Sequence, residues 1–149
     1  MIRPCAFRPA FLRSGTRSDF SGSVRVISSK VETVIHRRPG EVGFLLTSDI
    51  SSQAERWLLL ARAPLQSTVL KVGHHGSATS TTLEFLDRVR PMAAVISAGA
   101  DNPFGHPAPE VVGRLEAYVG ENVFCTAWHG TVELVTDGEK LSLKRERER

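Results

Sequence analysis

Residues 68–80 read Thr-Val-Leu-Lys-Val-Gly-His-His-Gly-Ser-Ala-Thr-Ser. The β-branched and apolar residues at the start of this stretch predict a short strand that ends at Gly73. His74 and His75 then lie on a turn between two glycines, and small hydroxyl residues lead into a predicted helix over residues 81–89. Two imidazoles at the end of a buried strand are held on a rigid support, which suits metal ligands and general acid–base groups. The alternative is a pair of surface histidines in a polar loop.

An acidic side chain follows the preceding predicted strand, and this favours a site over a surface loop. Residues 43–47 are nearly all apolar, which predicts a buried strand covered on both faces, and Asp49 comes shortly after it. Downstream, residues 93–97 predict a third buried strand, which opens into a loop rich in Gly and Pro that carries His106. Three successive strand ends therefore carry an acid, the His-His pair and a further histidine. In open α/β sheets, ligands bind at such strand ends.

Helical patterns alternate with these strands. One helix begins at Ser51 or Ser52, with Glu55 as the capping-box partner of Ser52, and its Trp57 is expected in the core. Another helix runs from the proline at position 109 to the glycine at position 120. The order strand, helix, strand, helix, strand, helix, strand predicts an α/β layer structure with helices against a buried sheet.

Two strand pairs flank this alternation. Their strands are predicted at residues 24–27, 31–35, 123–126 and 131–135. Residues 37–40 form a turn after the first pair, the second pair surrounds a turn at His129, and Asp137-Gly138 is a further turn. His36 and His129 are not expected to bind metal, because His36 lies in a presumed hairpin at the surface and His129 is expected to be a turn residue.

The strand-end residues form a plausible ligand set. One carboxylate with two or three imidazoles suits Zn²⁺, and also Mn²⁺ or Fe²⁺ where more oxygen is present. A bound divalent ion lowers the pKa of its water to about 7 and so supplies a hydroxide nucleophile. A simpler role for Asp49 is to cap the following helix, and a simpler role for His106 is to hydrogen-bond to a loop carbonyl. The residues alone leave these alternatives open.

The size and composition of the chain indicate one globular domain. Its 149 residues are 41% hydrophobic and 23% charged, and no apolar run approaches the length of about 20 residues that spans a bilayer. The net charge of +3 is too small to indicate nucleic-acid binding by itself. We expect a poorly specified basic leader over residues 1–23, the folded domain over residues 24–143, and a solvated charged tail over residues 144–149.

Five segments form a specific combination in this order, although each is weak alone: residues 44–50, 69–80, 95–99, 102–107 and 126–138. In this combination the chain resembles the later part of the metallo-β-lactamase-fold domain of ComEC-type competence proteins, which take DNA into bacteria. The resemblance implies a mixed sheet with flanking helices, the second half of an αββα sandwich. Family members usually have Thr-Gly-Asp where this chain has Thr47-Ser48-Asp49. A serine there is strained if that position needs a positive φ.

The resemblance also implies roles for the strand-end residues. Asp49 and His74 would bind a divalent metal, Zn²⁺ or Mn²⁺, with two ions in the complete domain. His75 and His106 are the candidate catalytic residues: His75 as a general acid or a support for the ligands, and His106 as a residue that lines the cleft. The activity of the family is nuclease-like hydrolysis of one DNA strand during import, so single-stranded DNA is the implied partner. The soluble domain of the family accompanies a multi-helix channel in the bacterial inner membrane.

Two parts of the family pattern are missing from this chain: the channel helices and the H-x-H-x-D-H motif. We therefore expect a fragment, or the product of a truncated gene, that is soluble and retains part of a metal site. The expected function is that of a metal-dependent nuclease or phosphodiesterase in DNA uptake. One alternative is a non-catalytic module that binds DNA or a partner subunit. Another is an inert remnant whose uncovered sheet face causes homo-oligomers or aggregates.

Overall fold

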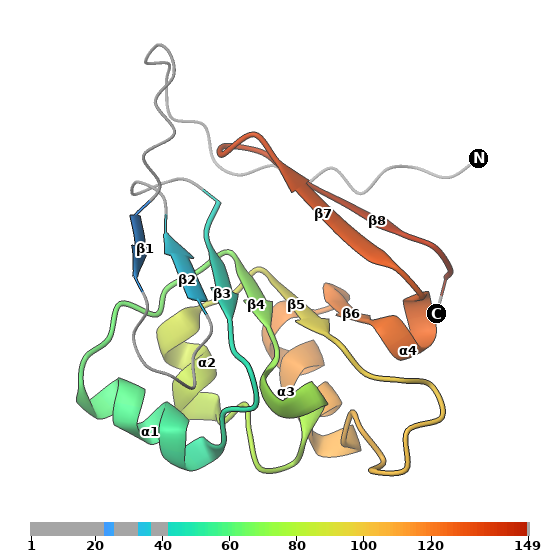
Figure 1. Cartoon of the computed structure of the whole chain (residues 1–149), viewed down its shortest axis with the longest axis horizontal. Coiled ribbons are helices and arrows are strands. Elements are labelled where there is room, and N and C mark those ends of the chain that lie inside the picture. Colours follow the sequence, from blue (N-terminus) through green and yellow to red (C-terminus); the bar gives the residue numbers. More distant parts are fainter. Residues whose placement is uncertain (1–22, 26–32, 37–41, 149) are drawn as a thin grey trace.

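The structure, a computed structural model, describes residues 23–25, 33–36 and 42–148. Within these residues, six strands form one sheet in the order β1-β2-β3-β4-β5-β6 (Figure 1): β1 Ser23–Arg25, β2 Thr33–His36, β3 Phe44–Leu46, β4 Val69–Lys71, β5 Ala93–Ile96 and β6 Val123–Cys125. β1, β2 and β3 pair antiparallel, and β3 to β6 pair parallel. The predicted α/β class with a mixed sheet is confirmed. Most of the predicted basic leader, and the turn at residues 37–40, lie outside the described residues.

Three helices connect the parallel strands and cover one face of the sheet (Figure 1): α1 Ser52–Leu60, α2 Leu83–Val89 and α3 Pro109–Val119. The strand residues that face them occupy matching positions of adjacent strands, as Leu45, Leu70 and Ala94 do, and these three are 0–1% exposed. Each buried side chain of the size of leucine contributes about 1.5–3 kcal/mol. This core holds the strand ends in place. No helix in the described ranges is long and apolar enough to cross a membrane.

Helix α1 presents a different face to the core from the one that the sequence suggests. Glu55 and Leu58 are its buried residues and Leu59 packs partly against the core, whereas Trp57 is 66% exposed. The prediction that Trp57 lies in the core is therefore wrong. The buried stripe runs through positions 55, 58 and 59, at a spacing of three and four residues, and Trp57 lies on the other side of that stripe.

Glu55 joins α1 to α2 and does not form the predicted capping box with Ser52. Its carboxylate accepts hydrogen bonds from the backbone N–H groups of Thr81 (2.5 Å) and Thr82 (2.9 Å) and from the Thr82 hydroxyl (2.8 Å). Thr82 in turn caps α2, because its side chain accepts from the N–H of Phe85. The buried charge therefore lies at the positive end of the α2 dipole and satisfies backbone donors there.

The predicted pairing of residues 123–126 with residues 131–135 is wrong. β6 pairs with β5 in the main sheet, and one helical turn, α4 (Thr126–His129), follows it. β7 (Val132–Thr136) then pairs with β8 (Leu141–Arg145) in a separate hairpin, with the turn at Asp137-Gly138 where the sequence predicts it. β8 includes the first two residues of the predicted charged tail.

His129 is buried, and its Nδ1 accepts a hydrogen bond from the Cys125 N–H (3.0 Å), so it has a structural role in α4.

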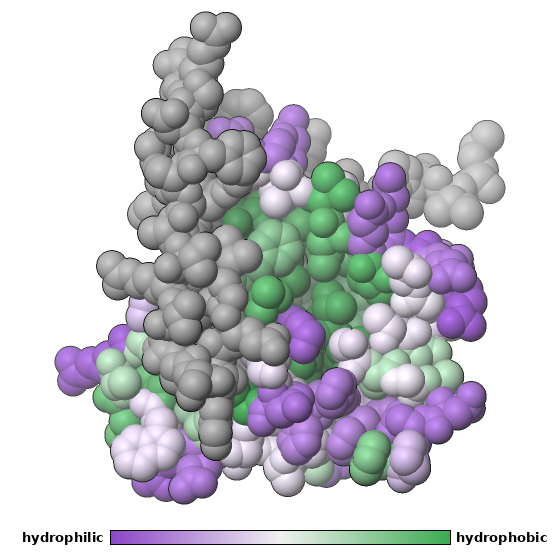
Figure 2. Space-filling model, viewed as in Figure 1, coloured by the Kyte–Doolittle hydropathy of each residue, from purple (hydrophilic) through white to green (hydrophobic). Residues whose placement is uncertain are grey.

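The second face of the sheet carries no helix in the described part of the chain. Phe44, Leu46 and Val95 alternate with core residues along their strands, so their side chains point to this second face, where they are half-buried. Figure 2 shows an apolar area over the sheet, beside the β7–β8 hairpin. This open sheet face, defined by Phe44, Leu46 and Val95, is apolar but incompletely covered.

Candidate active site at the strand ends

The carboxyl ends of β3 and β4 leave the sheet at the same level, because Leu46 is the register partner of Lys71 and the strands are parallel. Two hydrogen bonds join the segments that follow. The Thr47 hydroxyl donates to the Lys71 carbonyl (2.5 Å), and the His74 N–H donates to the Ser48 carbonyl (2.9 Å). β5 pairs in parallel with β4, so its end reaches the same edge. The strand ends therefore converge.

The turn after β4, residues 73–76, has an unusual backbone. His74 (φ 50°, ψ 42°) and His75 (φ 56°, ψ 20°) both adopt the left-handed conformation, and the next glycine does so too (φ 79°). For a residue other than glycine this conformation costs about 1–2 kcal/mol, and such strain is concentrated at functional sites. The buried Ser80 hydroxyl holds the turn by donating to its first carbonyl (3.0 Å). Ser48 does not have a positive φ, so the strain considered from the sequence is absent there.

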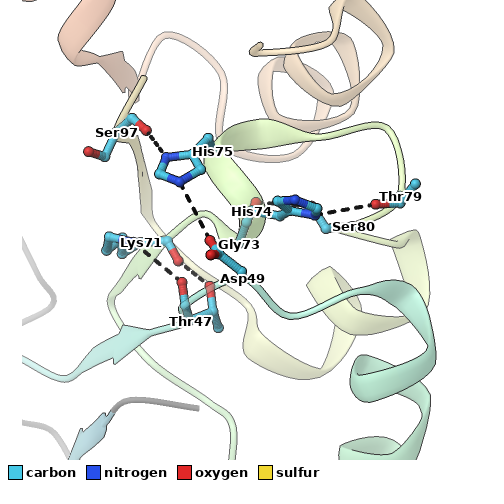
Figure 3. A network of polar contacts seen from close by, with 9 residues as sticks. All are labelled: Thr47, Asp49, Lys71, Gly73, His74, His75, Thr79, Ser80 and Ser97. Atoms are coloured by element: carbon cyan, nitrogen blue, oxygen red, sulfur yellow. Dashed lines mark hydrogen bonds and ion pairs between the residues drawn. The ribbon is translucent and has the colours of Figure 1, made fainter. Parts of the chain in front are cut away.

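Asp49 and His75 form a pair at this edge (Figure 3). Nε2 of His75 lies 3.5 Å from Oδ1 of Asp49, and Nδ1 of His75 lies 2.6 Å from the carbonyl oxygen of Ser97, at the end of β5. A carbonyl oxygen only accepts hydrogen bonds, so Nδ1 carries a proton. The side chains of His75 and Asp49 are 51% and 67% exposed. The Ser97 carbonyl therefore orients the His75 ring, and the pair is accessible from solvent.

The donor set of this pair fits a cation. With its proton on Nδ1, the neutral His75 ring has a lone pair on Nε2, and that lone pair faces the negative carboxylate of Asp49. The lone pair of Nε2 and the carboxylate repel each other. A second proton on the ring, or a divalent cation held between the two side chains, makes the interaction attractive. Histidines that bind metals usually donate their other ring N–H to a carbonyl or carboxylate, as His75 donates to Ser97.

His74 is adjacent to this pair in sequence, but its ring lies elsewhere. In Figure 3 the ring points away from Asp49 and toward Thr79, whose hydroxyl is 3.5 Å from Nδ1 of His74. The ring lies edge-on to that of His106, with centroids 5.9 Å apart. Among the described residues, the structure thus brings Asp49 together with His75, and His74 together with His106. The imidazole next to Asp49 is not that of His74, the ligand that the resemblance implies.

Asn102 organises the loop that carries His106. Its amide group donates to the carbonyls of Gly99 (2.7 Å) and His106 (2.6 Å), and its side-chain oxygen accepts from the N–H groups of Phe104 (3.2 Å) and His106 (3.0 Å). Nδ1 of His106 is buried without a hydrogen-bond partner among the described residues. This nitrogen therefore does not bond to a loop carbonyl, which was the simpler role considered for the residue.

Two contributors to the site were not identified from the sequence. Asn102 precedes a proline, which is a turn signal, but that signal does not reveal the four hydrogen bonds that its side chain makes. The carbonyl of Ser97 has no sequence signal, since every residue has a backbone carbonyl. Only the position of Ser97 at the end of a predicted strand indicates that it lies near the other strand ends.

The described residues do not form a metal site by themselves. No group of three or more His, Cys, Asp or Glu side chains that could hold a metal ion is found in ranges 23–25, 33–36 and 42–148. A catalytic zinc site takes three protein ligands and leaves one position for water or substrate. Asp49 and His75 would provide two of these ligands.

No protein-family model matches the chain. The chain is 34% identical over 100 residues to ComE operon protein 3 of Bacillus subtilis (strain 168), a region that covers 67% of this chain and 13% of that protein. It is 38% identical over 108 residues to Recombination protein 2 of Haemophilus influenzae, covering 72% of this chain and 13% of that protein. It is 39% identical over 80 residues to Competence protein ComA of Neisseria gonorrhoeae, covering 53% of this chain and 12% of that protein.

These relatives are much longer than the region that they share with this chain, which spans 12–13% of their length. Within that region, more than a third of the aligned residues are identical in each case, at 34–39%. The chain is therefore similar to a short part of proteins that are named for competence and recombination.

Proposed function

We propose that this chain acts in bacterial DNA uptake and contributes Asp49 and His75 to a metal-dependent phosphodiesterase centre for single-stranded DNA. The similarity to competence proteins supports the role in DNA uptake. The observation that carries the proposed chemistry is the alignment of Asp49, His75 and the Ser97 carbonyl. The carbonyl fixes the proton on Nδ1, and this leaves Nε2 to face the Asp49 carboxylate at 3.5 Å.

In this proposal Asp49 and His75 hold a divalent ion, Zn²⁺ or Mn²⁺, and the remaining ligands come from outside the described residues. A divalent ion at such a site lowers the pKa of water to about 7 and offsets the charge of a phosphate group. The residues of this chain bind and orient: Asp49 supplies a negative oxygen, and Ser97 keeps the His75 ring in one tautomer. The sequence does not distinguish His74 from His75 as the ligand, and the geometry favours His75.

Metal binding is measured by calorimetric titration of the purified chain with Mn²⁺ and with Zn²⁺. We expect Asp49→Ala and His75→Gln to weaken binding of the ion at least tenfold, since each removes a ligand. His74→Gln should change it less than threefold. Glu121→Gln is the matched control, because Glu121 is exposed and precedes β6. It therefore lies at the amino end of the parallel strands, opposite to the candidate site. Equal losses in His74→Gln and His75→Gln would contradict the assignment of His75.

Hydrolysis is measured separately, with an end-labelled single-stranded oligonucleotide and the wild-type chain in Mn²⁺. We expect cleavage that EDTA and His75→Gln both abolish. Metal binding without cleavage would remove the phosphodiesterase from the proposal and leave the metal site.

A second candidate function is a non-catalytic module that binds DNA or a partner subunit. The small ligand set favours it, because the described residues contain no group of three metal-binding side chains. This alternative predicts salt-sensitive DNA binding that is unaffected by EDTA and by Asp49→Ala. The proposed enzyme predicts that both treatments stop turnover.

A further inference from the structure

Phe104 is an exposed aromatic residue beside the histidines of the candidate site. It lies in the loop between β5 and α3 and is 76% exposed, more than any other large apolar side chain in the described part of the chain. Its ring stacks on that of His106, with centroids 6.0 Å apart and an angle of 25° between the planes. The His106 ring in turn meets the edge of His74. Three rings therefore connect the surface to the turn that also carries His75.

The loop holds Phe104 in a defined position. The side-chain oxygen of Asn102 accepts the N–H groups of both Phe104 and His106, and the Asn102 amide donates to two loop carbonyls. At the end of the loop, the Ala108 N–H donates to the carbonyl of Gly76 (2.8 Å), which belongs to the His-His turn. A ring that is already positioned loses little conformational freedom when a ligand stacks on it.

We propose that Phe104, supported by His106, is a stacking platform for one base of a single-stranded polynucleotide whose backbone reaches the Asp49–His75 pair. This inference rests on the proposed function and names how the substrate is held. A flat ring with one face supported and the other open suits a nucleobase, because every base has a π-face, and paired bases in a duplex do not expose theirs. Stacking of this kind tolerates any sequence, as an enzyme that acts on DNA of arbitrary sequence requires.

The exposure of an aromatic side chain does not by itself support this inference. Trp57 is 66% exposed on α1, yet among the described residues it stacks on no other ring. Phe104 differs because it is backed by an imidazole and braced by Asn102. A protein segment that covers Phe104 is the other occupant to consider, and the experiment below separates it from a base.

The test is fluorescence anisotropy with a single-stranded oligothymidylate of about 12 nucleotides. EDTA is present, so that binding is measured without cleavage. We expect Phe104→Ala to weaken binding about 5- to 150-fold, the usual loss when one base loses its aromatic partner. Phe104→Trp should restore binding to within about threefold. Trp57→Ala is the control and should bind as the wild type does.

An oligonucleotide of the same length with abasic sites identifies the contact. The wild type should bind it about as weakly as Phe104→Ala binds oligothymidylate, and Phe104→Ala should cause no further loss. Thermal denaturation establishes that the variants are folded. The inference is overturned if the wild type and Phe104→Ala bind oligothymidylate with equal affinity. It is also overturned if Phe104→Ala weakens binding of both oligonucleotides equally, or if the wild type does not bind oligothymidylate.

The cleavage assay of the proposed function gives an independent result. If the wild type does not cleave DNA but Phe104→Ala loses base-dependent affinity, the platform stands and the phosphodiesterase fails. If the wild type cleaves DNA in Mn²⁺ but Phe104→Ala binds normally, the platform fails and the phosphodiesterase stands.

Discussion

The left-handed backbone of His75 places its ring between two strand ends. Nδ1 reaches the Ser97 carbonyl after β5, and Nε2 reaches Asp49 after β3, although His75 itself follows β4. The conformation is unfavourable for any residue with a Cβ atom, because that atom approaches the following carbonyl oxygen. The ring of His75 therefore connects the ends of three strands, and the strained backbone that places it there lowers the stability of the chain.

Because the strain at His75 comes from its Cβ atom, glycine should relieve it and alanine should keep it. We expect His75→Gly to be more stable than His75→Ala by about 0.5–1 kcal/mol, although glycine usually lowers stability by increasing the entropy of the unfolded chain. Urea unfolding followed by circular dichroism measures the difference. A His75→Ala variant that equals or exceeds His75→Gly in stability would show that the backbone is not left-handed.

Gly76 is required by both its conformation and its surroundings. Its φ is 79°, and a Cβ atom added there would lie 2.7 Å from Cβ of Pro107, closer than side-chain atoms approach. We expect Gly76→Ala to lower the free energy of unfolding by about 2–4 kcal/mol, from left-handed strain and overpacking. Gly113→Ala is the control: it lies in α3, a Cβ there meets nothing within 4 Å, and it should stabilise by about 0.5–1 kcal/mol. Equal effects of the two variants would contradict the packing of Pro107 on the turn.

At the scale of elements, Glu55 holds α1 to the start of α2, just after the His-His turn. Glu55→Gln keeps the shape but removes the charge and brings an amide donor near the N–H groups of Thr81 and Thr82. We expect a loss of about 2–3 kcal/mol in the free energy of unfolding, from a charged hydrogen-bond network that is no longer satisfied. Chemical denaturation measures it, with Glu121→Gln as a surface control expected within about 0.5 kcal/mol of wild type. A loss of less than about 0.5 kcal/mol in Glu55→Gln would mean that the carboxylate does not hold the start of α2.

The elements that alternate along the chain could be predicted because their signals are local. Apolar runs such as residues 43–47 mark buried strands, and Pro109 marks the start of α3. The sequence predicts the wrong partner for β6, because a short apolar run is compatible both with a hairpin and with a parallel neighbour. In the structure β6 is a parallel neighbour of β5, and α3 packs against both strands.

The meeting of the strand ends could be predicted from the sequence, but not which side chains face one another there. Parallel pairing requires the ends of β3 and β4 to meet, so Asp49 and the two histidines were expected near one another. Which of His74 and His75 faces Asp49 depends on backbone angles that are rare outside glycine, and no sequence pattern signals them. The N-cap role considered for Asp49 is not adopted either, because α1 begins after Ser51.

At the scale of the whole molecule, the helices that the structure describes cover only one face of the sheet. The residues of the open sheet face (Phe44, Leu46 and Val95) are half-buried, while their neighbours toward the helices are almost fully buried. A partly exposed apolar sheet face is a site for association with another surface. The relatives are much longer than the region that they share with this chain, which is 13% of their length.

For the isolated chain, we expect the open sheet face to cause self-association, because a second copy can cover it. Sedimentation velocity at increasing protein concentration should show a shift from monomer to dimer. Phe44→Glu places a charge on this face, near the start of β3 and away from Asp49, and should raise the dissociation constant at least tenfold, since burying an unpaired carboxylate is unfavourable. Leu83→Glu makes the same chemical change at a residue that is 55% exposed on α2, on the helix side, and should leave association unchanged. A chain that stays monomeric at all concentrations, or a dimer that Leu83→Glu weakens as much as Phe44→Glu does, would place the contact elsewhere.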